Sequence, residues 1–294
     1  MSLKHRLESV AIRLLMGLFS LLPVDTASAI GGAIGRALGP MTGIHRKARR
    51  QMLDILCDTP PATIDQYLAD MWDNLGRTMA EYPHLEYIAA NRVTYENQAG
   101  LTQEKLDPTA AIFISGHFAN WEVAGPALLH YYHTPLDLLY RAANNRGVDG
   151  ILARYRSLNG KLSSFPKSRT GMRALVDALK HNRKIGILID QKYNEGIVAD
   201  FFGKPAMASA VYAQLGQKFN CPVYPAQVVR THGAHFHITL YPALSLWEND
   251  GTTPRAVADI VAETHALLYS WMRAHPAQWL WVHQRWSSKG LKSG

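Results

Sequence analysis

Residues 111–122 read AIFISGHFANWE, and this stretch decides the fold. Its first five residues form a short apolar run with isoleucine and phenylalanine, which predicts a buried strand. Gly116 ends the run, so His117 stands where that strand reaches the surface. Ligands of open α/β sheets bind beyond the carboxyl ends of the strands, so this position is open to chemistry. A histidine after a strand can equally be an ordinary turn residue.

The spacing of His117 and Glu122 limits how they can meet. Inside one helix, a separation of five residues would turn the two side chains about 140° apart, off a shared face. We therefore expect His117 in the turn after the strand and Glu122 one turn inside the following helix. From there the carboxylate can fold back to the imidazole and fix its tautomer, as the orienting group of a catalytic base does. Asn120 is expected to line the site or to cap the helix.

Short apolar runs alternate with helical patterns from residue 92 onward. This interleaving predicts an α/β fold in which a mixed central sheet is flanked by helices, and no linker-like stretch divides residues 41–294. The two cysteines, Cys57 and Cys221, have neither metal-binding nor disulfide spacing. Strands are expected at 92–96, 111–115, 135–140, 185–190, 223–229 and 235–241, and helices at 44–56, 62–82, 120–132, 146–158, 170–181, 209–219 and 254–275.

The basic charge of the chain is concentrated near its N-terminus. The first 50 residues hold eight lysines and arginines against Glu8 and Asp25, which accounts for +6 of the net charge of +8. The residues between these charges are apolar, at 14–22 above all, which is unlike a nucleic-acid-binding arm. This run is too short to span a bilayer, which takes about twenty residues. We expect residues 1–40 to form helices that lie on a membrane surface.

A cleaved signal peptide is the alternative for this segment. Basic residues precede the apolar run, and residues 27–29 read ASA, as a cleavage site does. Glu8 and Arg13 lie inside the leading segment, and residues 30–38 continue apolar. These features favour retained helices.

Several blocks, in their order and spacing, resemble the lysophospholipid acyltransferase superfamily, and within it the bacterial lipid A biosynthesis acyltransferases, which transfer lauroyl and myristoyl groups. The likeness runs over most of the chain. Residues 142–145 read AANN where the family pattern has a proline, so the acceptor loop differs there. The blocks are the strand-Gly-His-x4-Glu stretch at 111–122, Tyr140-Arg141, Ser168-Arg169, ILIDQ at 187–191, FFGKPA at 201–206 and PAQWLWVHQRW at 276–286.

The resemblance implies transfer of a fatty acyl group from acyl carrier protein to a hydroxyl of a lipid A precursor, with no metal or cofactor. The enzyme would be peripheral or monotopic on the cytoplasmic face of the inner membrane. His117 would take the hydroxyl proton as general base, and Glu122 would orient it. Arg141 and Arg169 are candidates for phosphate binding, because guanidinium offers bidentate donors. Asp190 ends an apolar strand and can reach the same crevice as a substrate-binding residue.

Two other functions remain open at this point. A related enzyme would acylate another phospholipid or glycolipid, with acyl-coenzyme A as the donor. A non-catalytic lipid-binding membrane protein would use His117 and Glu122 only structurally. The histidines at 232, 235 and 237 cluster without a carboxylate or thiol beside them, so we expect no metal site there. Acyl chain length would depend on the depth of an apolar groove.

Overall fold

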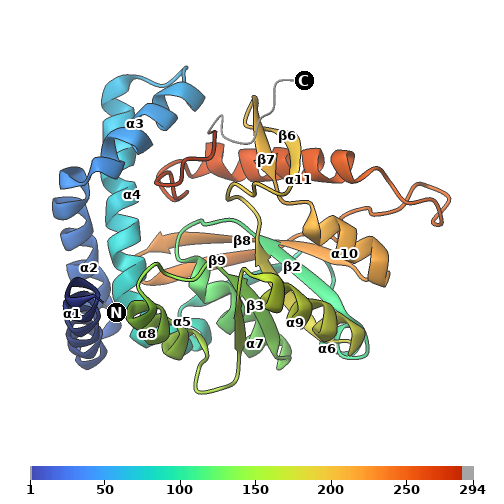
Figure 1. Cartoon of the computed structure of the whole chain (residues 1–294), viewed down its shortest axis with the longest axis horizontal. Helices are drawn as coiled ribbons and strands as arrows, with labels where there is room; N and C mark the ends of the chain where they lie inside the picture. Colours follow the sequence, from blue (N-terminus) through green and yellow to red (C-terminus); the bar gives the residue numbers. More distant parts are fainter. Residues whose placement is uncertain (1, 287–294) are drawn as a thin grey trace.

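A mixed seven-stranded sheet forms the centre of the computed structural model, which describes residues 2–286 (Figure 1). The strand order is β1-β9-β8-β2-β5-β3-β4. Neighbouring strands are parallel except for β8 and β9, which pair as an antiparallel hairpin. The mixed α/β sheet expected from the sequence is thereby confirmed. The strands are β1 (Val93–Asn97), β2 (Ala111–Ser115), β3 (Leu136–Tyr140), β4 (Ser163–Pro166), β5 (Lys184–Leu188), β8 (Val223–His232) and β9 (His235–Leu240).

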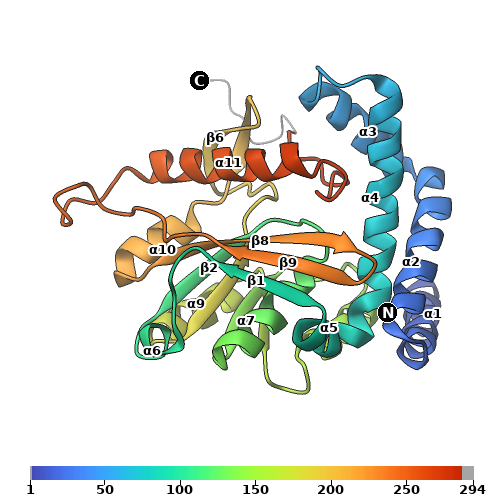
Figure 2. The same ribbon diagram turned by 180° about the vertical axis from the view of Figure 1, so that it is seen from behind.

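Helices cover both faces of the sheet and stand along one of its ends (Figures 1 and 2). The helices over the faces are α5 (Leu85–Asn91), α6 (Gln103–Leu106), α7 (Ala124–Tyr132), α8 (Arg146–Arg156), α9 (Arg169–Lys180), α10 (Val211–Phe219) and α11 (Val257–Ala274). The helices at the end are α1 (Leu3–Leu21), α2 (Val24–Leu38), α3 (Gly43–Ile55) and α4 (Pro61–Glu81). Short 3₁₀ turns cover Gly39–Met41, Tyr82–His84 and Trp121–Val123.

Alternating residues of the central strand β2 point into two separate hydrophobic cores. Ile112 and Ile114 pack into the core that α9, α10 and α11 cover. Ala111 and Phe113 pack into the core that α5 and α7 cover. All five residues of β2 are buried, which explains why its sequence is apolar throughout instead of alternating.

Helix α2 packs along α4 so closely that their backbones touch. A Cβ atom on Gly31 would lie 2.5 Å from the carbonyl oxygen of Gly76, and one on Gly35 would lie 2.2 Å from that of Trp72. Only glycine, which lacks Cβ, permits this approach. The suspected cleavage site at residues 27–29 lies inside α2, where Ala27 is buried.

Helix α1 buries one side and leaves the other apolar and exposed. Met16 and Phe19 are buried against the domain. Within residues 2–286, no helix is long and apolar enough to cross a membrane. We call the exposed apolar side of α1 the outer stripe; its residues are Leu3, Leu7, Val10, Leu14, Leu18 and Leu21, which are 55–82% exposed.

A second, two-stranded sheet packs beside α11 and was not expected from the sequence. Its strands are β6 (Ile197–Phe201) and β7 (Lys204–Ala208), which pair antiparallel. The indole of Trp286 donates a hydrogen bond of 2.8 Å to the carbonyl of Phe201. Trp279 and Trp281 are buried beside it, so the tryptophans of the C-terminal block pack inside the protein. Residues 287–294 of the expected domain lie outside the described residues.

Candidate active site

The turn after β2 is tightly held and sets the position of His117. Ala119 has a positive φ of 47°, a conformation that costs an L-residue about 1–2 kcal/mol. Its amide donates to the carbonyl of Gln278 at 2.8 Å. Its carbonyl accepts hydrogen bonds from the Asn74 amide at 3.0 Å and the Thr78 hydroxyl at 3.1 Å, both on α4. These contacts compensate for the unfavourable turn and fix His117 at the carboxyl end of the strand.

His117 is paired with Asp190, which follows the neighbouring strand β5. The imidazole Nδ1 lies 2.7 Å from Oδ1 of Asp190, and the His117 backbone amide donates to Oδ2 at 2.8 Å. The indole of Trp279 donates to the same Oδ2 at 2.8 Å. Strands β2 and β5 are parallel neighbours with Ser115 opposite Leu188, so the residues that follow them meet at one edge of the sheet.

The charge of Asp190 determines which ring nitrogen of His117 carries the proton. Burial would raise the pKa of this carboxyl, but His117 and the donors around it hold the pKa well below its usual range. Asp190 is therefore ionised and accepts only, so Nδ1 of His117 is the protonated nitrogen. The lone pair of Nε2 is left facing a cleft that His117 lines together with Tyr140, Arg141 and His283. This is the arrangement that a general base needs.

A side-chain amide lies next to that lone pair. Nε2 of Gln191 is 3.0 Å from Nε2 of His117 and 2.6 Å from Nε2 of His283. Burial and the neighbouring His117 lower the pKa of His283 to about 4, so its ring is neutral and can accept near neutral pH. The two hydrogens of the Gln191 amide thus serve two acceptors.

Glu122 does not make the contact with His117 that its spacing suggested. Its carboxylate accepts two hydrogen bonds from Arg156, at 2.7 and 2.8 Å, and others from Tyr82 at 2.7 Å and Trp121 at 3.1 Å. Burial would raise the pKa of Glu122, but the Arg156 guanidinium holds it below its ordinary value. The prediction that Glu122 reaches back to the imidazole is therefore wrong, because the buried guanidinium is the stronger partner and Asp190 occupies Nδ1.

Asn120 and Asp190, the other two residues predicted to bind substrate, are buried and hydrogen-bonded to protein groups. Asn120 is fully buried: its side-chain oxygen Oδ1 accepts from the backbone amide of Glu122 at 3.1 Å, and its side-chain Nδ2 donates to Glu81 at 2.8 Å. It caps the 3₁₀ turn, the second of its two expected roles. Asp190 is 4% exposed and its oxygens are used by His117 and Trp279.

Arg141 and Arg169, the two arginines predicted to bind phosphate, do line one groove. Arg141 lines both the cleft at His117 and a basic groove that continues from it. Arg169 and Lys167 line this basic groove as well, together with Gln191. The groove therefore offers several cationic donors close to the candidate base.

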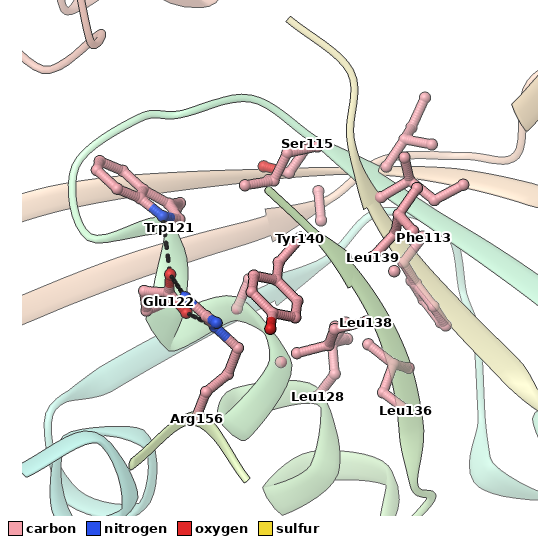
Figure 3. A pocket seen from close by; sticks show the side chains of 17 residues that line it. Phe113, Ser115, Trp121, Glu122, Leu128, Leu136, Leu138, Leu139, Tyr140 and Arg156 are labelled. Atoms are coloured by element: carbon pink, nitrogen blue, oxygen red, sulfur yellow. Dashed lines mark hydrogen bonds and ion pairs between the residues drawn. The ribbon is translucent and has the colours of Figure 1, made fainter. Parts of the chain in front are cut away.

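An apolar pocket opens beside the cleft, under the carboxyl ends of β2, β3 and β5 (Figure 3). The Glu122–Arg156 pair and Tyr140 lie at one end of it, and these three residues line the cleft as well. The remainder is lined mostly by apolar side chains, including Phe113, Leu128, Leu136 and Leu138.

Several residues of this site were not singled out from the sequence. Arg156 and Tyr82 hold Glu122, and Gln191 and His283 contact the imidazole or its neighbour. Gln191 and His283 lay inside blocks that carried the family resemblance, which was the available signal. Arg156 had none, because it is one of several arginines on a basic helix.

Comparison with known families identifies the family to which the chain belongs. A family model described as bacterial lipid A biosynthesis acyltransferase matches residues 4–288, nearly the whole chain. A search of curated proteins finds no match. The match includes the strand, the turn and the paired His117 and Asp190. The chain therefore belongs to the bacterial lipid A biosynthesis acyltransferase family and is an acyltransferase of lipid A biosynthesis.

Proposed function

We propose that the protein transfers a fatty acyl group from an acyl carrier protein thioester to a hydroxyl of a lipid A precursor, with His117 as general base. The observation that carries this proposal is the 2.7 Å hydrogen bond between Nδ1 of His117 and Asp190. Asp190, in place of Glu122, orients the base. The pair lies where an apolar pocket meets a basic groove, a combination suited to an acyl chain and a phosphorylated lipid.

The reaction uses few groups. The acceptor hydroxyl displaces the Gln191 amide from Nε2 of His117 and gives its proton to that nitrogen as its oxygen attacks the thioester carbon. Asp190 stabilises the imidazolium that forms. When the C–S bond breaks, the imidazolium returns the proton to the thiolate of the carrier. Proton transfer by a positioned base of this kind contributes about 10²- to 10⁴-fold in rate.

Glu122 acts in this scheme through Arg156. The Glu122 carboxylate accepts hydrogen bonds from Nε and Nη2 of Arg156. Nη1 of Arg156 is buried and has no hydrogen-bond partner among residues 2–286. Arg156 lines both the apolar pocket and the cleft. We assign its free donor to the thioester carbonyl oxygen, where negative charge develops. Glu122 is then a positioning residue.

The basic groove serves the acceptor, with Arg141 and Arg169 binding phosphate through bidentate hydrogen bonds. Acyl carrier proteins are acidic as a family, so cationic residues near the cleft also speed the encounter with the donor. Residues 1–40 hold the enzyme on the cytoplasmic face of the inner membrane. The outer stripe of α1 supports contact with a bilayer, because six exposed apolar side chains on one helix face are suited to its headgroup boundary.

The apolar pocket gives a prediction about acyl chain length. Leu128 is 4% exposed and lines the pocket, so Leu128→Trp should fill part of it and shift the preference toward shorter acyl chains. Excluding two methylene groups from burial costs about 1.6 kcal/mol, which lowers kcat/KM for the longer donor about fifteen-fold. Competition between acyl donors of different length, read by mass spectrometry, measures this. An unchanged chain preference in a folded variant would place the acyl chain elsewhere.

The function is tested by incubating the purified protein with a lipid A precursor and labelled acyl donor. We expect transfer of label to the lipid from acyl carrier protein, and much slower transfer from acyl-coenzyme A. The His117→Ala variant is the control, and it should lose at least 10²-fold in kcat. Faster transfer from acyl-coenzyme A, or acylation of phospholipids in preference to the lipid A precursor, would contradict the proposal.

A further inference from the structure

A second groove lies between helices α1 and α8, outside the cleft. Its walls carry three exposed arginines, Arg13 of α1 and Arg146 and Arg154 of α8. None of the described residues that line it is a carboxylate. The remaining lining is small, aliphatic or aromatic: Met16, Gly147, Gly150, Ile151 and Tyr155.

Helix α8 separates this groove from the cleft. Leu152 and Arg156 of this helix line the cleft. Successive residues of an α-helix turn by about 100°, so these two lie on a different face of the helix from Arg146, Gly150 and Arg154. Helix α1 is fastened to the start of α8 by Asn145, which donates to the carbonyl of His5 at 2.8 Å. The groove is thus bounded by two helices that are hydrogen-bonded to each other.

The three groove arginines differ from nine other arginines of this protein, which are paired with carboxylates. Within residues 2–286, none of the three guanidinium groups makes a hydrogen bond or an ion pair with another side chain. Like charges along one groove repel one another, so the groove is more stable with an anion bound. By contrast, carboxylates pair with Arg36, Arg49, Arg77, Arg92, Arg156, Arg183, Arg230, Arg255 and Arg273.

We propose that this groove binds the phosphate of a bilayer phospholipid, apart from acyl donor and acceptor. The inference rests on the proposed contact of α1 with the membrane. Arg13 is the direct neighbour of Leu14 in the outer stripe. A helix whose apolar face enters the boundary of headgroups and acyl chains by about 5–10 Å brings an adjoining guanidinium level with the phosphates. Guanidinium binds phosphate oxygens through paired hydrogen bonds, and three guanidinium groups line this groove.

Gly150 keeps the groove open. A Cβ atom added there would meet no atom within 4 Å, although glycine inside a helix costs about 1 kcal/mol relative to alanine. Gly150→Leu therefore fills the groove without changing charge and without straining the helix. This variant distinguishes binding at a phosphate site of defined shape from diffuse electrostatic attraction to a basic surface.

The test is sedimentation with vesicles of phosphatidylcholine, alone or mixed with phosphatidylglycerol. Wild type should prefer the mixed vesicles, and the variant with Arg13, Arg146 and Arg154 changed to Gln should bind them on the order of 100-fold more weakly, about five-fold for each basic residue. The matched control loses the same charge from α6, α9 and α10, through Lys105→Gln, Lys180→Gln and Lys218→Gln. It should bind almost as wild type. The Gly150→Leu variant should bind the mixed vesicles at least ten-fold more weakly than wild type.

Three results would overturn the proposal. The first is wild-type binding by the arginine variant, and the second is wild-type binding by Gly150→Leu, which would mean diffuse attraction only. The third is a raised acceptor KM for both variants in phospholipid-free detergent, which would assign the groove to the acceptor.

The membrane contact of α1 is tested separately, because the double variant Leu7→Glu, Leu14→Glu should lose binding to both kinds of vesicle. If it binds both as wild type, that contact is wrong as well.

Discussion

Asp190→Asn is expected to lower kcat for acyl transfer by about 10²- to 10⁴-fold, while the acceptor KM changes little. An amide in this position presents either a donor or a neutral oxygen to Nδ1 of His117. When the donor faces Nδ1, the ring proton moves to Nε2, where the base must have its lone pair. When the oxygen faces Nδ1, the imidazolium loses the anion that stabilises it. Steady-state rates at saturating donor measure the loss.

Non-additivity separates this explanation from general damage to the site. If Asp190 acts only through His117, the double variant with His117→Ala is no slower than His117→Ala alone. Trp279→Phe is a useful comparison, because it removes one donor to Oδ2 of Asp190 and leaves the charge in place. Its rate should fall much less. A kcat for Asp190→Asn within about five-fold of wild type would show that the carboxylate does not orient the base.

Arg156→Met is expected to lower the free energy of unfolding by about 3–5 kcal/mol, because it leaves the Glu122 carboxylate buried without its cation. Both side chains of this pair are only 9% exposed. The hydroxyl of Tyr82 remains as a donor but does not neutralise the charge. Urea unfolding followed by circular dichroism measures the loss.

The compensating variant makes this second prediction specific. Arg156→Met combined with Glu122→Gln removes both charges, so most of the lost stability should return. Arg273→Met is the matched control, because it breaks an exposed pair with Asp58 and should cost at most about 1 kcal/mol. If both arginine variants lost the same free energy of unfolding, the buried Glu122–Arg156 pair would stabilise the protein no more than the exposed pair does.

The place of the candidate base was predictable from the sequence, and the identity of its partner was not. An apolar run that ends at Gly116 requires the strand to surface at His117, and the structure agrees. The sequence predicts Glu122 as the partner, because it lies five residues from His117. Asp190 is 73 residues from His117, and it reaches the imidazole because β5 pairs with β2 although two strands lie between them in sequence. No local pattern encodes that neighbourhood.

The strands that could not be predicted from the sequence share a local composition that only weakly favours a strand. Strand β4 is a short edge strand with two serines and a proline, a composition more typical of a loop. Strands β6 and β7 are joined by Phe202 and Gly203, both with positive φ. The ring contact between Phe202 and Trp279 stabilises that turn. By contrast, α4 and α11 are long and strongly periodic, and both begin and end within three residues of the expected bounds.

The glycine crossing of α2 and α4 fixes how the N-terminal helix α2 is attached to the domain. With no layer of side chains between Gly31, Gly35 and Gly76, the two helices cannot slide or tilt independently. Ser28 of α2 continues this connection through Glu81 to Asn120, in the turn that follows β2. In the proposed contact of the outer stripe of α1 with a bilayer, the domain would turn with its N-terminal helices, and these helices would set the height and direction of the cleft above the lipid.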